Sequence, residues 1–159
     1  MRQQGFAPEA PDRAALRFRG LLFQPTIVAT VMLVAIVTQS ATIFLLVSGV
    51  LWLNVLVPTA NPFENLYNRF IARPRGRPPL SKAPGPRRFA QGMAATFMMA
   101  AGLSLFRGWT AAAYAFEGFV AVAFAALLLG KFCLGAYVYH LLRGNVAFAN
   151  GTCPWSESR

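Results

Sequence analysis

Four long apolar stretches constrain what this chain can fold into more than any other feature. Apolar stretches of this kind form helices that cross the ~30 Å hydrocarbon core of a bilayer. Charged residues make up 13% of the chain, about half the usual share, and a soluble domain of this size would not bury so much apolar surface. We therefore predict a single all-α integral membrane domain, residues 1–159, built as a four-helix transmembrane bundle. The predicted spans are residues 21–38, 41–57, 90–106 and 111–142.

The first two stretches follow one another almost without interruption. As one helix, residues 21–57 would be about 55 Å long, nearly twice the hydrocarbon thickness. The chain must therefore reverse direction, and Gln39-Ser40 is the polar pair at which we expect the turn. The fourth stretch would be about 48 Å long as a straight helix. Whether it protrudes, tilts or bends near Gly130 or Gly135 stays open.

The polar segment between the second and third stretches, residues 58–89, has structure of its own. Asn61, Pro62 and Glu64 form a strong helix start: a capping side chain, a proline at the first helical position and an acid three residues after the cap. Apolar residues then recur at helical spacing, which predicts a short amphipathic helix over residues 62–72 lying in the membrane interface. This apolar stripe comprises Phe63, Leu66, Tyr67, Phe70 and Ile71.

Basic residues are concentrated in the same loop, and the formal net charge of the chain is +10. Positive charge beside apolar spans orients membrane proteins with the charged loops in the cytoplasm. We therefore place the loop, both termini and the tail over residues 143–159 on the cytoplasmic side of a bacterial inner (plasma) membrane. The placement argues against a nucleic acid partner and favours contact with the lipid bilayer, through anionic headgroups, or with a protein partner. The residues predicted to make that contact are Arg73, Arg75, Arg77, Lys82, Arg87 and Arg88.

Two charged residues, Glu117 and Lys131, lie inside the fourth apolar stretch. Isolated burial of a charge in a membrane is costly, so such residues are functional candidates. On one straight helix they would point to nearly the same face but lie about 21 Å apart, too far to pair. Two interpretations stay open: each side chain reaches water at an opposite interface, or Glu117 serves a proton or ion pathway.

Cys133, Tyr137 and His140 form a second group of candidates, because their spacing stacks them on one stripe of a helix. A thiol, a phenol and an imidazole in line would support redox or proton-transfer chemistry, which makes them the catalytic candidates of the chain. In the alternative interpretation, Cys133 is an inert core residue and the two rings are interface anchors. Whether Cys133 pairs with Cys153 stays open. His140 is the only histidine, and we predict no metal site and no cofactor.

Amide side chains in and next to the spans are predicted to hydrogen-bond between helices, or alternatively to line a small polar cavity for a ligand. They are Gln24, Gln39, Asn54 and Asn61. In the third span, small residues recur at every fourth position, which predicts the close approach of a neighbouring helix. That row comprises Gly92, Thr96, Ala100 and Ser104.

Three strings in the chain resemble a bacterial family of small integral membrane proteins classed as a domain of unknown function. They are Phe23-Gln24-Pro25, Asn61-Pro62-Phe63-Glu64-Asn65-Leu66-Tyr67-Asn68 and Phe132-Cys133-Leu134-Gly135-Ala136-Tyr137. The resemblance covers nearly the whole chain, from about residue 20 to residue 155, and implies a four-span inner-membrane protein with no assigned activity. A looser likeness, to DoxX-like four-helix membrane proteins, rests on span count and a late cysteine, and this chain has no CxxC pair.

These features leave three classes of function. We expect a non-enzymatic scaffold or partner-binding membrane subunit that uses the basic loop and the interfacial helix. One alternative is a thiol-redox protein with Cys133 as the reactive thiol, tuned by His140 or Lys131, and with a soluble cytoplasmic redox partner. The other is a small ion-coupled transporter that uses Glu117 in a homo-oligomer.

Overall fold

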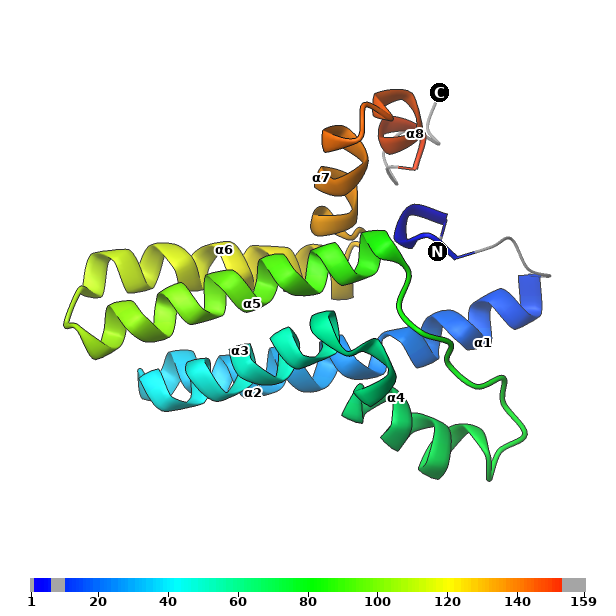
Figure 1. Ribbon diagram of the computed structural model, residues 1–159, viewed down its shortest axis with the longest axis horizontal. Helices are drawn as coiled ribbons and strands as arrows, with labels where there is room; N and C mark the ends of the chain where they lie inside the picture. Colours follow the sequence, from blue (N-terminus) through cyan, green and yellow to red (C-terminus); the bar gives the residue numbers. More distant parts are fainter. Residues whose placement is uncertain (1, 7–10, 153–159) are drawn as a thin grey trace.

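The computed structural model describes residues 2–6 and 11–152, and within these ranges all regular structure is helical, as predicted. Two long hairpins lie side by side, and shorter helices gather at one end of them (Figure 1). The first hairpin is formed by α2 (Phe23–Thr38) and α3 (Ala41–Leu56), and the second by α5 (Gly85–Phe106) and α6 (Thr110–Leu128). The shorter elements are η1 (Arg2–Gln4), α1 (Pro11–Leu21), η2 (Pro58–Ala60), α4 (Pro62–Tyr67), η3 (Asn68–Ala72), α7 (Leu134–Leu142) and α8 (Val146–Gly151).

The turn of the first hairpin lies at Gln39-Ser40, where the sequence predicts it. Gln39 adopts a left-handed conformation, φ 48°, and its N–H bonds the carbonyls of Ala35 and Ile36 at the end of α2. Ser40 then caps α3, because its Oγ accepts a hydrogen bond from the N–H of Ile43 at 3.4 Å. A left-handed residue followed by a serine cap ends one helix and begins the next within two residues.

The core lies where α3 packs against α5. Ser48 on α3 is buried, and its hydroxyl donates a hydrogen bond to the carbonyl of Ala95 on α5 at 2.8 Å. Gly102 allows the close approach, because a Cβ there would lie 2.9 Å from a leucine side chain of α3. The predicted row of small residues contributes unevenly: Ser104 is buried, whereas Thr96 is exposed and bonds its own helix. A row of every fourth residue winds gradually round a helix, so only part of it faces a neighbour.

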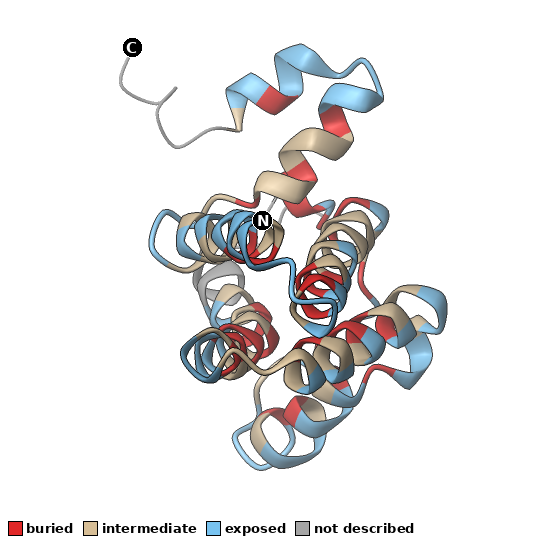
Figure 2. Cartoon of the chain, turned by 90° about the vertical axis from the view of Figure 1, so that its left-hand side faces the viewer, coloured by how far each residue is buried: buried red, intermediate tan, exposed pale blue. Residues whose placement is uncertain are grey.

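Three helical segments are long and apolar enough to cross a membrane: Leu16–Thr38, which joins the end of α1 to α2, Gly85–Phe106 and Thr110–Leu128. The fourth predicted span, α3, is apolar but has only 16 residues. Its length of about 24 Å falls short of the ~30 Å core, so three of the four predicted spans have full length and the fourth is a shorter apolar helix. In an end view the buried residues face the centre of the bundle (Figure 2). Large apolar side chains are exposed on all four hairpin helices, among them Leu33, Leu46, Phe106 and Phe119.

The last apolar stretch, predicted as one span over residues 111–142, is broken. After α6 ends, Lys131 adopts a left-handed conformation, φ 53°, before α7 begins. The N–H of Phe132 bonds back to the carbonyl of Ala126 at 3.0 Å, which closes the turn. At Gly130 a Cβ would lie 2.8 Å from the same carbonyl oxygen, so the turn has no room for a larger residue. Beyond this break, α7 runs at a steep angle to α6 (Figure 1).

In the segment between the hairpins, α4 follows η2 and begins where the helix-start motif predicts, and it continues into a π-helical turn, η3. The apolar stripe predicted here does not lie on one surface: Tyr67 is buried, whereas Leu66 and Phe70 are exposed. The change from α to π winding alters the spacing of residues that follow α4. The predicted amphipathic helix over residues 62–72 is therefore not confirmed as one continuous interfacial element.

Candidate functional site

Polar side chains from separate parts of the chain meet at the end of the bundle where α2 begins. Gln24 on α2 is buried, and its Oε1 accepts hydrogen bonds from Asn61 Nδ2 at 3.4 Å and from Gln91 Nε2 at 3.0 Å. Asn61 also caps α4, because its Oδ1 accepts from the N–H groups of Phe63 and Glu64. The hydrogen bonding predicted for Gln24 and Asn61 therefore gathers α2, α4 and α5 around one point.

Arg87 brings a positive charge into this cluster from the first turn of α5. The residue is 5% exposed, and its Nη2 donates a hydrogen bond to the carbonyl of Leu21 at 3.3 Å. The guanidinium carbon lies 5.9 Å from the centre of the Phe6 ring. Among the described residues, Nη1 has no hydrogen-bond partner. Arg87 is thus turned into the protein rather than toward a lipid or partner surface, because α5 begins at Gly85, before the predicted start of the span.

Glu64 on α4 adds a carboxyl group to the same buried region. It is 6% exposed, and no group in the described part of the chain hydrogen-bonds its Oε1. Burial raises the pKa of the Glu64 carboxyl, while the charge of Arg87 and the hydrogen bond with Asn61 act in the opposite direction. Because burial dominates, Glu64 holds its proton to a higher pH than an exposed glutamate, which limits the negative charge that it supplies to Arg87.

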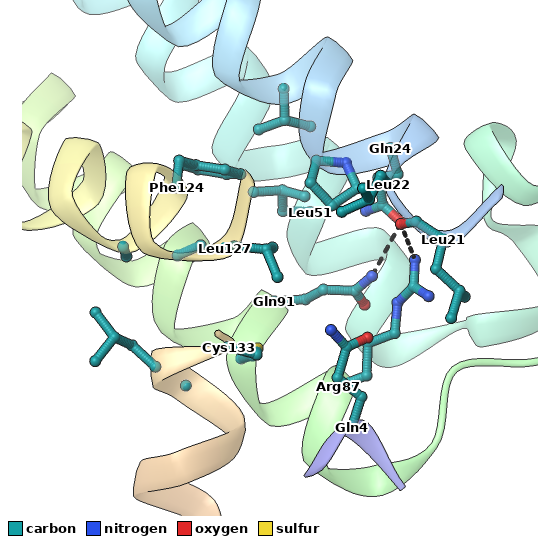
Figure 3. A pocket seen from close by; sticks show the side chains of 17 residues that line it. Gln4, Leu21, Leu22, Gln24, Leu51, Arg87, Gln91, Phe124, Leu127 and Cys133 are labelled. Atoms are coloured by element: carbon teal, nitrogen blue, oxygen red, sulfur yellow. Dashed lines mark hydrogen bonds between the residues drawn. The ribbon is translucent and has the colours of Figure 1, made fainter. Parts of the chain in front are cut away.

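A cavity of about 90 Å³ opens beside these groups (Figure 3). Its polar wall is formed by Gln4, Gln24, Arg87, Gln91 and Cys133. Its apolar wall comes from α2, α3 and α6 and includes Val28, Leu51, Phe124 and Leu127. The volume suits a few water molecules or one small organic group, and it is smaller than the pockets that hold drug-sized ligands.

Of the three residues that the sequence places on one stripe, Cys133 and His140 contact the same residue and Tyr137 contacts another. Cys133 is the N-cap residue of α7, and its N–H donates a hydrogen bond to Gln3 Oε1 at 3.1 Å. His140 Nε2 lies 3.0 Å from the backbone oxygen of the same Gln3. Tyr137 instead donates its hydroxyl to Asn150 on α8 at 3.0 Å. Of the three, Cys133 lines the cavity and the two rings do not.

Burial also sets the chemistry of Cys133. It raises the pKa of the thiol, although backbone N–H groups at the start of α7 and the charge of Arg87 act in the opposite direction. The thiol is therefore neutral at physiological pH, and a neutral thiol is a weak nucleophile. Cys153, which the sequence offers as its disulfide partner, lies outside the described residues.

The two charges of the fourth apolar stretch lie in different settings. Glu117 is 3% exposed, and Gln39 Nε2 donates to its two carboxylate oxygens at 3.4 and 3.3 Å. The carboxylate is thus held between the turn of the first hairpin and α6 rather than directed to water. Lys131 is exposed in the break after α6. The two side chains therefore do not share one face of a straight helix.

The chain between η3 and α5, residues 73–84, is here called the basic segment. Arg73, Arg75 and Lys82 are exposed on it, and Arg77 is half-buried. These four residues keep the surface position that contact with lipid headgroups or a partner requires.

Two side chains fix the base of the basic segment. Asn68 Nδ2 donates to the carbonyl of Leu80 at 3.0 Å, and the N–H of Leu80 donates to Asn68 Oδ1 at 2.7 Å. Arg88 Nε donates to the carbonyl of Val55 at the end of α3 at 3.1 Å. Arg88 thus joins α5 to α3, a role that its place in a run of basic residues does not reveal.

Sequence reasoning missed Gln3, Gln4 and Gln91 as members of the cluster. The place of Gln91 in the cluster could have been predicted, because Gln91 follows Arg87 by four residues and so lies on the same face of the helix. Gln3 and Gln4 lie on η1, whose contacts with α5 and α7 no periodicity in the sequence indicates. Within the residues that the structure describes, no group of three His, Cys, Asp or Glu side chains is placed to hold a metal ion.

A family model described as "Domain of unknown function (DUF4395)" matches residues 16–143 of the chain. The chain belongs to the DUF4395 family. This confirms the resemblance to a family of that type. The matched part of this DUF4395 protein contains the cluster residues Gln24, Asn61, Glu64, Arg87, Gln91 and Cys133, whereas Gln3 and Gln4 precede it. No curated protein and no solved structure matches the chain.

Proposed function

We propose that this DUF4395 protein is a multi-pass protein of the bacterial inner membrane that acts as a non-enzymatic scaffold or partner-binding subunit. The observation that carries the proposal is the separation of two kinds of surface. Large apolar side chains are exposed along the hairpin helices, whereas the exposed charges of the basic segment lie beyond their ends. Such a division fits helices in lipid and a basic surface at the cytoplasmic interface.

The path of the chain supports four crossings despite the shortness of α3. The turn between α2 and α3 and the turn between α5 and α6 lie at the same end of the molecule (Figure 1). Because α2 and α3 run antiparallel between that end and the basic segment, α3 has to return the chain across the same thickness as α2. A 16-residue helix achieves this where the bilayer thins locally, at a modest free-energy cost.

Labelling of single cysteines tests the crossings and the orientation. In a background without Cys133 and Cys153, we would introduce Thr38→Cys, Arg107→Cys or Lys82→Cys and treat intact cells with a maleimide that does not cross the membrane. We expect labelling at positions 38 and 107 from outside, and at position 82 only after permeabilisation. Labelling of all three positions from one side would contradict the crossings of α3 and α5.

The role of the basic segment is tested with a triple variant, Arg73→Gln, Arg75→Gln and Arg77→Gln. Native mass spectrometry of the detergent-extracted protein would measure retained phosphatidylglycerol, and affinity purification from crosslinked membranes would measure a recovered partner. We expect both to fall in the triple variant. Arg107→Gln, which removes an exposed charge at the opposite end, should change neither. Unchanged lipid and partner recovery in the triple variant would refute this role.

A second candidate function, ion-coupled transport, is favoured by one observation. Glu117 is buried on an apolar helix with Gln39 as its hydrogen-bond partner, and buried carboxyls inside membrane helices are typical of ion and proton pathways. Proteoliposomes containing the protein should then show an ion flux that Glu117→Gln abolishes. Vesicles without any flux would leave the non-enzymatic binding role as the better interpretation.

A further inference from the structure

The cavity beside Arg87 has two chemically different walls. Its polar wall carries a guanidinium and three glutamine amides, and its apolar wall carries aliphatic and aromatic side chains from α2, α3 and α6. Figure 3 shows Arg87, Gln24 and Gln91 on one side of the space and Phe124 and Leu127 on the other. A ligand that fills this cavity therefore needs a polar head and an apolar body.

The guanidinium determines what the polar head is. A guanidinium has five N–H donors, and Nη1 of Arg87 is buried without a partner while Nη2 bonds a backbone carbonyl. A buried charge without a partner is strongly unfavourable. Glu64 acts on Arg87 through its charge alone, because no hydrogen bond joins the two among the described residues and Glu64 Oε1 is itself buried without a partner. The remaining donor positions fit an anion that arrives from outside the chain.

A carboxylate fits better than a more highly charged anion. The planar guanidinium matches a carboxylate in two parallel hydrogen bonds. Arg87 is the one cationic residue that lines the cavity as described, so a phosphate dianion would keep an uncompensated charge. The cavity volume of about 90 Å³ limits the body of the ligand to a few carbon atoms unless the hairpins separate.

We propose that this cavity is a binding site for a monocarboxylate with an apolar tail. The carboxylate bonds Arg87 Nη1, Gln91 turns its amide to the second oxygen, and the tail lies between Phe124, Leu127 and Leu51. The site is separate from the basic segment, so it stands whether or not that segment binds lipids or a partner. The same chemistry has two sources, a free short-chain carboxylate or a fatty acid drawn from the bilayer.

The test uses the full-length protein in a mild detergent, with thermal unfolding and calorimetry as readouts. Pentanoate and decanoate represent the two sources, and pentan-1-ol and pentylamine are the controls that lack the carboxylate. We expect one or both carboxylates to raise the melting temperature saturably and the two controls to have no effect. Binding of pentanoate identifies a free ligand, and binding of decanoate alone identifies a lipid-derived one. Absence of binding by both carboxylates, or equal binding of pentan-1-ol, would overturn the proposal.

Variants assign the binding to this cavity. Arg87→Gln should weaken carboxylate binding about tenfold or more, and Arg107→Gln should leave it unchanged. Because Arg87→Gln removes a buried group and is prone to misfolding, Ala123→Leu gives a second measurement. Ala123 lines the cavity as a small residue, so a larger side chain there should exclude the tail while the protein stays folded. Full carboxylate affinity in a folded Ala123→Leu protein would contradict the site.

Discussion

Buried polar residues in this molecule differ in whether they have partners. Ser48 and Gln24 bond neighbouring helices, and contacts of this kind stabilise membrane bundles by about 0.6–2 kcal/mol. Asn54 near the end of α3 is 1% exposed, and both of its polar side-chain atoms lack a partner among the described residues. An unpaired buried polar group lowers the free energy of unfolding by about 1–3 kcal/mol. Burial of a polar residue is therefore informative only together with its hydrogen bonds.

Asn54→Leu is expected to stabilise the protein. The substitution replaces an unpaired amide with an apolar group of similar size, so the free energy of unfolding should rise by about 1 kcal/mol or more. Ser48→Ala is the matched change on the same helix, and loss of its bond to Ala95 should lower that free energy by about 0.5–1.5 kcal/mol. Thermal unfolding in detergent measures both. A melting temperature that falls in Asn54→Leu would show that Asn54 has a partner in the membrane.

The thiol of Cys133 is expected to react slowly at neutral pH. Burial holds its pKa above the usual value, which is about 8.5. The reactive thiolate should therefore form at a higher pH than that of an exposed cysteine, and the alkylation rate should keep rising with pH where that of an exposed cysteine has levelled off. Mass spectrometry of iodoacetamide-treated protein measures the rate, and Ser81→Cys provides an exposed control in the same chain. Rapid alkylation of Cys133 at pH 7 would instead support the thiol-redox alternative.

Some of these residue roles follow from the sequence, and others depend on the fold. Gln24, Gln39 and Asn61 are amides in or beside apolar stretches, so a partner on another helix is predictable, and each has one. Arg87 was not predictable in the same way. Whether it belongs to a loop or to the buried turn of a helix depends on where α5 begins, and helix starts are poorly defined by apolar periodicity alone.

At the scale of elements, close approach of backbones decides where helices cross. α7 packs against α5 at Gly135, where an added Cβ would lie 2.5 Å from the Cβ and 2.6 Å from the Cα of Ala90. Contacts shorter than 3 Å to backbone atoms leave no room for a side chain to adjust. The position of α7 beside the cavity therefore depends on the absence of a side chain at residue 135.

Gly135→Ala is expected to lower the free energy of unfolding by about 1–3 kcal/mol, the usual range for overpacking. Gly118→Ala on α6 is the matched control, because no atom lies within 4 Å of a Cβ added there. This second change should raise the free energy of unfolding by up to about 1 kcal/mol, since alanine favours the helix more than glycine does. Denaturation of both variants in detergent tests the contrast. Equal effects of the two substitutions would show that α7 is not docked on α5.

The long apolar elements were predictable because segments of their length and composition fold almost only as buried or membrane helices. The turn at Gln39-Ser40 was predictable because residues 21–57 are too long for one membrane helix. The length of residues 111–142 allowed a break between α6 and α7 but did not predict it. The break depends on the left-handed conformation of Lys131, a residue type that does not usually indicate such a turn. The π-helical turn that follows the buried Tyr67 is likewise not indicated by the apolar spacing.

At the scale of the whole molecule, the two ends of the hairpins differ in chemistry. Of the residues that the structure describes, one end carries the short turns at Gln39 and Gly108 and the exposed Arg107. The other end carries the basic segment, the buried Arg87 and the cavity that Arg87 lines. Both proposed interactions, at the surface and in the cavity, therefore concern the same end of the molecule.

Because of the paired hydrogen bonds of Asn68 and the contact from Arg88 to Val55, the fold does not depend on an unbroken chain between η3 and α5. These contacts join the chain before residues 73–79 to the chain after them. The polypeptide can therefore be cut within residues 73–79 while the two fragments stay associated. Brief trypsin treatment that cuts after Arg75, which precedes Gly76, should thus yield fragments that co-elute in size-exclusion chromatography and separate only in denaturant. The same reasoning predicts that the two hairpins, expressed as separate chains divided at Gly76, reassemble in the membrane.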